Sequence, residues 1–469
     1  MMMSAVVVHS SQQGVFDRSM YQSKPPYSCI PFIVWLTIHY SRVTSFSPTS
    51  FPVVFGRIAK KYGVTNQPTY MQYRSRSAST LSMQSSTKQN PNFRECILAK
   101  DCRALTDCAR LRNGILMPWV GFGTYRLGKD NVVMATNQAL RAGYRQIDTA
   151  FIYGRETTER LVGEAIQKAI QKGTLADRRD VFITSKQWRS YHGYDSTMKC
   201  LRLSLKRLDT DYIDLWLMHH PGPAWKQKSK SDSDDNDQGE VDDLWKRTIH
   251  ESVQCPADMD KLRSETWRAM EDAYLEGKVL AIGVCNMSVD QLERLRETAR
   301  IVPMVHQFEF HPLYPQTAML EYCAEHNILV TAYASLGGQD TNRTEWERLL
   351  GSGIETTQKR KRTSSKEPPT NLLHASPVMD LAKKYNVTTA QVLLRWALEQ
   401  NCSIIPKTSS AERMRQNADL FSFSLSKAEV NQLANDLQQI VQANIREDAS
   451  LLESTRLCWR GDPFRIKDF

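Results

Sequence analysis

The chain has 469 residues, enough for two or three domains of ordinary size, although α/β barrels reach roughly 250 residues and more as single units. Hydrophobic residues make up 41% and charged residues 24%, as in soluble globular proteins, and no apolar run reaches the roughly 18–20 residues that span a bilayer. The formal net charge is +10, but residues 1–94 carry +9 of it and the remainder only +1, so the composition excludes a basic body that binds nucleic acid. We therefore expect neither a nucleic-acid partner nor a stable membrane association.

Residues 1–94 are expected to form a presequence that lies outside the fold. They contain a single acidic residue, Asp17, and the apolar run Ser28–Ile38 has the length of a signal-peptide core. A basic, Ser-rich stretch follows, with the composition of a transit peptide. This order resembles the two-part plastid presequence of algae with secondary plastids, which implies a plastid protein. The alternative is a cytoplasmic protein with a mispredicted start; the internal starts are Met71 and Met83.

The rest of the chain, residues 95–469, alternates short apolar stretches with amphipathic ones after an initial hairpin. Asn113-Gly114, between ARLR and ILMPWV, predicts a β-hairpin turn. The predicted strands are Trp119–Gly123, Arg145–Thr149, Val181–Lys186, Ile213–His219, Leu280–Asn286, Met304–Glu309, Leu329–Ala334 and Ser403–Pro406.

Helix signals lie between these strands. Predicted helices include Asn131–Ala142 before Gly143, Glu265–Glu276 before Gly277, the helix opened by the capping box of Ser288 and Gln291, and Thr389–Glu399 after Thr388. Eight strand–helix repeats predict a closed parallel (β/α)8 TIM barrel with an N-terminal β-hairpin. An open, doubly wound sheet is the alternative before motifs are considered.

Two polar stretches interrupt the alternation, at about 224–263 and 337–376. Each follows a predicted strand, so both are expected to be inserted βα loops at the catalytic face of the barrel. We interpret them as solvated insertions; a binding element is the alternative.

The ten cysteines include no C-x-x-C pair, and Cys96, Cys102 and Cys108 have no histidine nearby at ligand spacing. We expect free thiols in a reducing compartment and no metal site, with a metal or disulfide framework as the alternative.

Polar and ionisable residues recur at the carboxyl ends of the predicted strands, which meet at one rim of a barrel. These residues are Asp148 with Tyr153 just beyond it, Lys186, His219, Cys285, Asn286, Gln307, Tyr333 and Lys407. Each alone has a structural explanation, as a packed aromatic or a solvated charge. Because buried ionisable groups are costly unless they are paired or used, their convergence on one rim indicates a functional site.

The combination suits carbonyl reduction, which needs a hydride and a proton for the developing alkoxide. A phenol with a pKa near 10 is a poor acid at pH 7, but a neighbouring ammonium favours the phenolate and so strengthens the acid. Lys186 is expected to act in this way on Tyr153, with Asp148 holding the lysine. His219 is expected to donate to the carbonyl oxygen as charge develops.

These motifs resemble the aldo-keto reductase superfamily across about residues 111–437. The matching segments, in order, are GYRQIDTA with Tyr153, FITSKQW with Lys186, DLWLMHHP with His219, KVLAIGVCN, HQFEFHP, VTAYASLGG and IIPKTSSAERMRQN. The resemblance implies an NADPH-dependent reductase of aldehydes or ketones, with Tyr153, Asp148, Lys186 and His219 as catalytic residues. It implies Tyr125, His219 and His220 as substrate-binding residues.

The resemblance also implies how the cofactor is held. The expected cofactor-binding residues are Gly123, Thr124, Asp148, Cys285, Asn286, Gln307, Tyr333, Leu336, Asp340, Lys407, Thr408, Arg413, Gln416 and Asn417. Lys407, Thr408 and Arg413 would surround the adenosine 2′-phosphate, since arginine suits bidentate phosphate recognition, and this favours NADPH over NADH.

The sequence departs from the family pattern in several places. The segment after Tyr153 is about three residues longer than usual, Cys285 stands where Ser is commoner, and His306 where Asn is commoner. Tyr125 and His220 occupy positions often held by Trp, so a more polar substrate pocket is expected. The C-terminal GDPF, residues 461–464, resembles the family's specificity loop weakly.

Two other functions remain as alternatives. The same fold serves as a non-catalytic nucleotide-sensing subunit of membrane channels, and such relatives can retain the catalytic residues. A hydrolytic barrel would need a serine nucleophile or paired carboxylates at strand ends, and neither is apparent. We expect a monomer that acts on a small carbonyl substrate.

Overall fold

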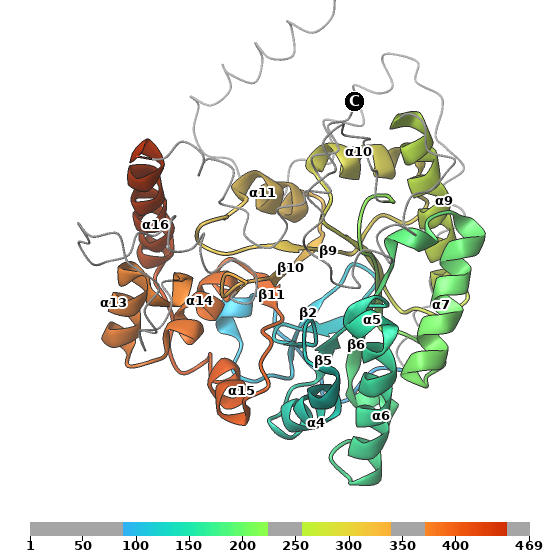
Figure 1. Cartoon of the computed structure of the whole chain (residues 1–469), viewed down its shortest axis with the longest axis horizontal. Helices are drawn as coiled ribbons and strands as arrows, with labels where there is room; N and C mark the ends of the chain where they lie inside the picture. The colour runs from blue at the N-terminus through green and yellow to red at the C-terminus, as the bar shows by residue number, and fades with distance from the viewer. Residues whose placement is uncertain (1–87, 224–255, 339–370, 448–469) are drawn as a thin grey trace, which may run out of the picture. The chain divides into compact units, whose positions relative to one another are not determined.

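The structure is a computed structural model, which describes residues 88–223, 256–338 and 371–447. Its centre is a sheet of eight parallel strands that neighbour one another in chain order (Figure 1). The strands are β4 (Phe122–Gly123), β5 (Gln146–Asp148), β6 (Phe182–Gln187), β7 (Leu215–Met218), β8 (Ile282–Cys285), β9 (Val305–Glu309), β10 (Leu329–Tyr333) and β11 (Cys402–Ile404).

Hydrogen bonds between the first and last strands close this sheet into a barrel. The backbone N–H of Gly121 donates to the carbonyl of Ile404 at 2.8 Å, and that of Gly123 donates to Pro406 at 3.0 Å. Gly123 must be glycine here, because a Cβ atom would lie 2.6 Å from the carbonyl oxygen of Ile405. The predicted (β/α)8 barrel is confirmed, the open sheet is wrong, and each predicted strand coincides with an observed one.

Helices follow the strands around the outside of the barrel (Figure 1). The α-helices are α4 (Val132–Arg141), α5 (Tyr153–Glu156), α6 (Thr158–Gln171), α7 (Tyr194–Leu208), α9 (Pro256–Leu275), α10 (Val289–Thr298), α11 (Thr317–Glu325), α13 (Ser376–Tyr385), α14 (Thr389–Leu398), α15 (Ala411–Ala418) and α16 (Lys427–Glu447). The 3-10 helices are η1 (Ala99–Asp101), η2 (Lys129–Asn131), η3 (Arg178–Asp180), η4 (Arg189–Tyr191) and η5 (Leu372–His374). Throughout the described ranges, no helix is long and apolar enough to cross a bilayer.

The predicted helix caps are present. Ser288 and Gln291 form a reciprocal capping box at the start of α10, and Thr388 forms one with Gln391 at the start of α14. After α4 the chain turns at Gly143, whose φ of +97° is favourable for glycine.

A small three-stranded sheet precedes the barrel and consists of β1 (Arg94–Glu95), β2 (Asp107–Arg110) and β3 (Leu116–Pro118). β2 and β3 form the predicted hairpin, although its loop has three residues between Leu111 and Ile115, with Gly114 at a φ of +89°. The parallel partner β1 was not predicted, because two residues carry no detectable periodicity.

Two predicted boundaries are wrong. Residues 88–94 belong to the folded body rather than to the presequence: Lys88 donates to Gly277 O at 3.2 Å, and Arg94 pairs with the buried Asp107 at 2.6 Å. The inserted loops are also shorter than expected, because α9 already begins at Pro256, inside 224–263, and the buried Leu372 lies inside 337–376. The central parts of both insertions lie outside the described residues.

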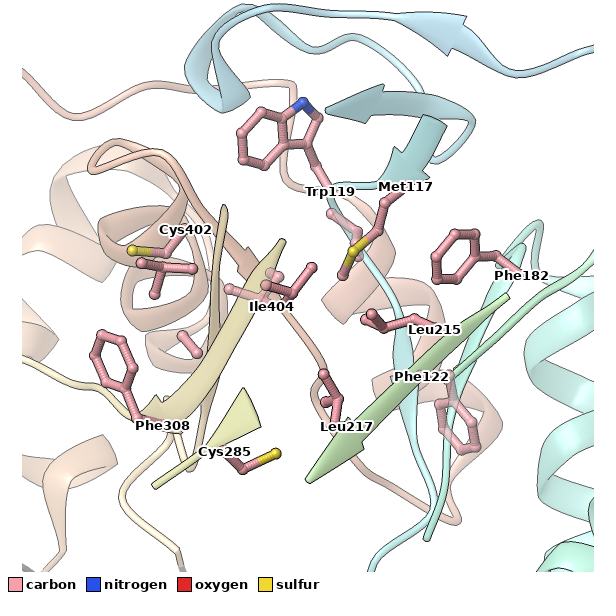
Figure 2. Close-up of a cluster of buried hydrophobic side chains, with 14 of the residues drawn as sticks. Met117, Trp119, Phe122, Phe182, Leu215, Leu217, Cys285, Phe308, Cys402 and Ile404 are labelled. Atoms are coloured by element: carbon pink, nitrogen blue, oxygen red, sulfur yellow. The ribbon is translucent and has the colours of Figure 1, made fainter. Parts of the chain in front are cut away.

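The barrel interior is filled by apolar side chains (Figure 2). Leu215 and Leu217 of β7 and Phe182 of β6 are buried there, and Met117 of the hairpin points between Leu215 and Ile404. The hairpin therefore covers one end of the barrel and leaves the carboxyl ends of the strands as the other rim, where catalytic groups are found in this fold.

Candidate active site

Three predicted catalytic residues meet at this rim. The Nζ atom of Lys186, at the end of β6, donates to Oδ1 of Asp148 at 2.6 Å and lies 3.2 Å from the phenolic oxygen of Tyr153. The chain places Tyr153 here because the backbone N–H of Phe151 donates to Lys186 O, which turns the segment after β5 over the end of β6. The phenol, the ammonium and the carboxylate thus form one connected chain.

The Asp148–Lys186 pair is held by further hydrogen bonds. Lys186 also donates to the carbonyl oxygen of Thr149 at 2.8 Å, and Nε2 of Gln307 donates to the second carboxylate oxygen of Asp148 at 2.8 Å. Both charged side chains are almost fully buried. A buried ion pair is stable only when its remaining donors and acceptors are satisfied, so these contacts fix the position of the ammonium under the phenol.

The electrostatics of Tyr153 differ from the sequence-based expectation in one respect. Burial raises the pKa of its phenol above the ordinary value, and Lys186 offsets only part of this increase. The effect of Lys186 thus has the predicted direction but is outweighed by desolvation. Burial also lowers the pKa of Lys186, but the charge of Asp148, followed by that of Tyr153, outweighs this and raises it overall. At neutral pH the site therefore combines a protonated phenol with a charged ammonium.

His219 faces Tyr153 from the end of β7, with the ring centroids 5.9 Å apart. Burial, followed by the charges of Lys186 and Arg189, lowers the pKa of His219 well below its usual value, so the imidazole is neutral. A neutral imidazole can donate a hydrogen bond from only one ring nitrogen. His219 can thus polarise a carbonyl oxygen without competing with Tyr153 as the stronger acid.

Aromatic side chains surround this pair. His220 stacks on His219 at 4.9 Å, Tyr125 lies 5.0 Å from Tyr153, and Trp188 stands edge-on to both histidines. Tyr125 is 43% exposed, whereas His220 is fully buried. Tyr125 and His220 were predicted to line the pocket, but Trp188 was not. Its place two residues after Lys186 could have indicated that it lies near the site.

Asn286 connects three strand ends. Its Nδ2 donates to His219 O at 3.0 Å, and its Oδ1 accepts from the hydroxyl of Tyr333 at 2.7 Å. Beside it, the buried thiol of Cys285 lies 3.9 Å from Oε1 of Gln307. These contacts bring together four of the expected cofactor-binding residues, and they leave Tyr333 partly exposed at the rim.

A second group of expected residues lies around the start of α15. Lys407 and Thr408 precede the helix, Arg413 is exposed in its first turn, and Ser410 caps it. This set fits a phosphate group, because the helix N-terminus, a hydroxyl and two cations all favour an anion. Gln416 and the buried Asn417 follow on the same helix.

Two expected cofactor residues have structural roles that the sequence did not indicate. The hydroxyl of Thr124 is fully buried and donates to Asp148 O at 2.9 Å, so its side chain ties β4 to β5. Gly123 permits barrel closure, as described above. Leu336 is partly buried at the rim beyond β10, while Asp340 and the GDPF segment lie outside the described residues.

The described part of the chain contains one cluster of side chains of the types that bind metal ions, and it lies at the small N-terminal sheet. It consists of Cys96, Cys102 and Asp107. The carboxylate of Asp107 already accepts from Arg94 and from the backbone N–H groups of Arg103 and Ala104. These donors occupy the lone pairs that a cation would need. The seven cysteines in the described ranges are free thiols.

An eight-stranded α/β barrel with a hydrogen-bonded tyrosine, lysine and aspartate and a neighbouring histidine at its carboxyl rim defines a class of reductase, and comparison with known proteins identifies the family. A family description, "Aldo/keto reductase family", matches residues 119–436. The chain belongs to this family of oxidoreductases.

Several relatives are similar over most of their length. The chain is 32% identical to the glyoxal reductase of Bacillus subtilis over 331 residues, which are 70% of this chain and 92% of that protein. It is 34% identical to an aldo-keto reductase family 1 member A1 of Xenopus tropicalis, covering 68% of this chain and 85% of that one. A solved aldo-keto reductase of Bombyx mori, in complex with NADP, is 30% identical with a TM-score of 0.54, covering 72% of this chain and 93% of that one. The predicted cofactor type agrees with that complex.

Proposed function

We propose that this protein reduces aldehydes or ketones to alcohols with NADPH, and that Tyr153 supplies the proton. The observation that carries the proposal is the hydrogen-bonded chain from Tyr153 through Lys186 to Asp148, at 3.2 and 2.6 Å. When bound, NADPH supplies the hydride. The glyoxal reductase of Bacillus subtilis and a pentose reductase of Pyricularia oryzae, which is 33% identical, are relatives with carbonyl substrates.

The chain's own residues account for the remaining steps. A carbonyl oxygen between Tyr153 and His219 would receive hydrogen bonds from both as the alkoxide develops. The phenol then passes its proton to that oxygen, and the charged Lys186 stabilises the phenolate left behind. Asp148 keeps the lysine in place, so the cation need not reorganise during the reaction.

The test is a Tyr153→Phe variant, which keeps the ring and removes only the proton. Carbonyl turnover should fall by at least the roughly 10²–10⁴-fold that acid catalysis contributes, while NADPH affinity should stay near wild type. Lys186→Met should damage turnover comparably. The double variant should be little worse than Tyr153→Phe alone, because residues that act as one unit are not independent.

Stopped-flow measurement of hydride transfer, with glyoxal, a pentose and an aromatic aldehyde as substrates, checks this expectation. Tyr194→Phe is the matched control, since this exposed tyrosine lies on α7 and its hydroxyl donates to Asp272 at 2.9 Å. A Tyr153→Phe enzyme within a few-fold of wild type, with chemistry rate-limiting, would contradict the assignment. A single turnover of bound NADPH without steady-state reduction would instead favour a nucleotide sensor.

A further inference from the structure

The backbone immediately after Tyr153 has an unusual conformation. Gly154, Arg155 and Glu156 have φ values of 56°, 53° and 68°, so three consecutive residues occupy the left-handed region. Residues other than glycine rarely adopt it, because Cβ approaches the carbonyl oxygen. At Gly154 a Cβ atom would lie 2.5 Å from Oγ1 of Thr158. Such a turn persists only when its surroundings hold it in place.

One side chain of α7 contacts the chain on both sides of Tyr153. The Nη2 atom of Arg207 donates to Oε2 of Glu156 at 2.6 Å, three residues after Tyr153. Its guanidinium carbon lies 4.1 Å from the centroid of the Phe151 ring, two residues before Tyr153. Arg207 thus connects the start and the end of the segment that carries the phenol.

The same arginine is linked to the strand that carries Lys186. Its Nη1 atom lies 3.7 Å from Oε2 of Glu159, a fully buried residue of α6. The other oxygen of Glu159 accepts from the hydroxyl of Ser185 at 2.6 Å. Burial raises the pKa of Glu159, and its contacts with Ser185, Ser204 and Arg207 oppose this increase. Arg207 therefore supports both the tyrosine segment and, through Glu159, the residue next to Lys186.

We propose that Arg207 is a positioning residue, which holds the left-handed turn after Tyr153 so that the phenol stays within reach of Lys186. The inference rests on the proposed reductase function, because it assigns to Arg207 an effect on proton donation. The side chain of Arg207 is 20% exposed, and within the described residues its side-chain contacts are those with Phe151, Glu156 and Glu159. Its effect on chemistry must therefore pass through the residues that it supports, which are Tyr153 and, through Glu159 and Ser185, Lys186.

Two variants of different severity test the proposal. Glu156→Gln removes the ion pair to the turn but leaves the Arg207–Glu159 contact, so the fold should persist. Arg207→Met removes both carboxylate contacts and the cation over Phe151 while keeping an unbranched stem, and Arg207→Lys restores a cation. We expect hydride transfer to slow by on the order of 10- to 100-fold in Arg207→Met, as for a small misplacement of a catalytic group, and by less in Glu156→Gln. Arg207→Lys should recover part of the rate.

Three further readouts separate positioning from a general loss of structure. The Kd for NADPH, from fluorescence titration, should stay near wild type in all three variants. In a Tyr153→Phe background, Arg207→Met should cause little further loss, because the group that it positions is gone. Arg202→Met, on the exposed face of the same helix, is the matched control and should retain wild-type rates.

Each outcome decides the question. An Arg207→Met enzyme with a wild-type rate, or one that loses rate equally in the Tyr153→Phe background, would overturn the proposal. A parallel fall of NADPH affinity and rate would show a structural role only and would also overturn it. A wild-type chain without NADPH-dependent turnover of any carbonyl would instead refute the proposed function, so the two failures are distinguishable.

Discussion

At the scale of single residues, Arg413 offers a test of cofactor choice. It is exposed in the first turn of α15, the helix that Lys407 and Thr408 precede in the chain. Loss of a charge-assisted contact with a phosphate costs about 1.5–3 kcal/mol, which is roughly a ten- to hundred-fold loss of affinity. We expect Arg413→Ala to weaken NADPH binding by this amount and NADH binding little, since NADH lacks the 2′-phosphate.

Equilibrium titration of both cofactors measures the difference. Arg415→Ala is the matched control, because Arg415 is also on α15 but lies two residues further from its N-terminus. Equal weakening of NADPH and NADH by Arg413→Ala would rule out a 2′-phosphate contact.

The buried side chain of His306 should make the stability of the protein depend on pH. Burial lowers the pKa of this side chain from 6.5 to about 3, and its Nε2 accepts from the backbone N–H of Met287 at 3.2 Å. Because the folded pKa lies below the unfolded one, the unfolded chain binds the extra proton between these values. The free energy of unfolding must therefore fall as the pH drops from 6.5 towards 3, by about 1.4 kcal/mol per pH unit for this group.

His306→Asn should reduce this slope by about that amount, since an amide oxygen can accept the same hydrogen bond and does not titrate. Urea unfolding at several pH values between about 4 and 6 gives the slope. Buried His219 and His220 also have lowered pKa values, so part of the acid sensitivity should remain. The partly exposed His326, replaced by Asn, serves as control. If the wild-type and His306→Asn slopes agreed, the buried neutral state of His306 would be disproved.

At the scale of elements, the sequence predicted the strands and helix starts that a local pattern encodes. Apolar stretches bounded by turns marked the eight strands. The capping box at Ser288 and the cap at Thr388 marked two helix starts to the residue. The start of α9 was missed because a polar segment precedes it. Pro256 at the helix start, with Met259 and Leu262 at helical spacing, was the available signal.

The candidate site was predictable to a similar degree. Strand-end positions and the family resemblance placed Asp148, Tyr153 and Lys186 at one rim, where the structure joins them by hydrogen bonds. The balance of burial against charge at Tyr153 was not predictable, because desolvation depends on packing from several elements. The contacts of Arg207 likewise join residues that are far apart in the sequence, such as Phe151, and no local pattern encodes them.

At the scale of the whole molecule, the residues before β1 form a strap across the end of the barrel opposite Tyr153. The carbonyl of Lys88 accepts from the hydroxyl of Tyr212 at 3.0 Å, and the Gln89 amide both donates to and accepts from the backbone of Leu116 at 3.1 Å. Asn90 donates to Asp180 O at 3.1 Å. Tyr212 and Asp180 precede strands, so the strap lies at the amino ends of the strands.

This placement predicts different effects for two truncations of the chain. Removal of residues 1–86 should leave NADPH-dependent turnover and stability unchanged, because every strap contact is retained. Removal of residues 1–93, which ends before Arg94, should also leave kcat unchanged, since the catalytic rim is at the other end of the barrel. It should however lower the free energy of unfolding by roughly 1–3 kcal/mol, the sum of several hydrogen bonds at about 0.5–1.5 kcal/mol each less the chain entropy regained. Thermal unfolding and steady-state kinetics of both truncated proteins, beside the full chain, give these quantities.

Two results would contradict this expectation. A chain beginning at Thr87 that was folded but inactive would mean that the residues before it contribute to the site. Equal stability of the two truncations would show that the strap contacts contribute nothing.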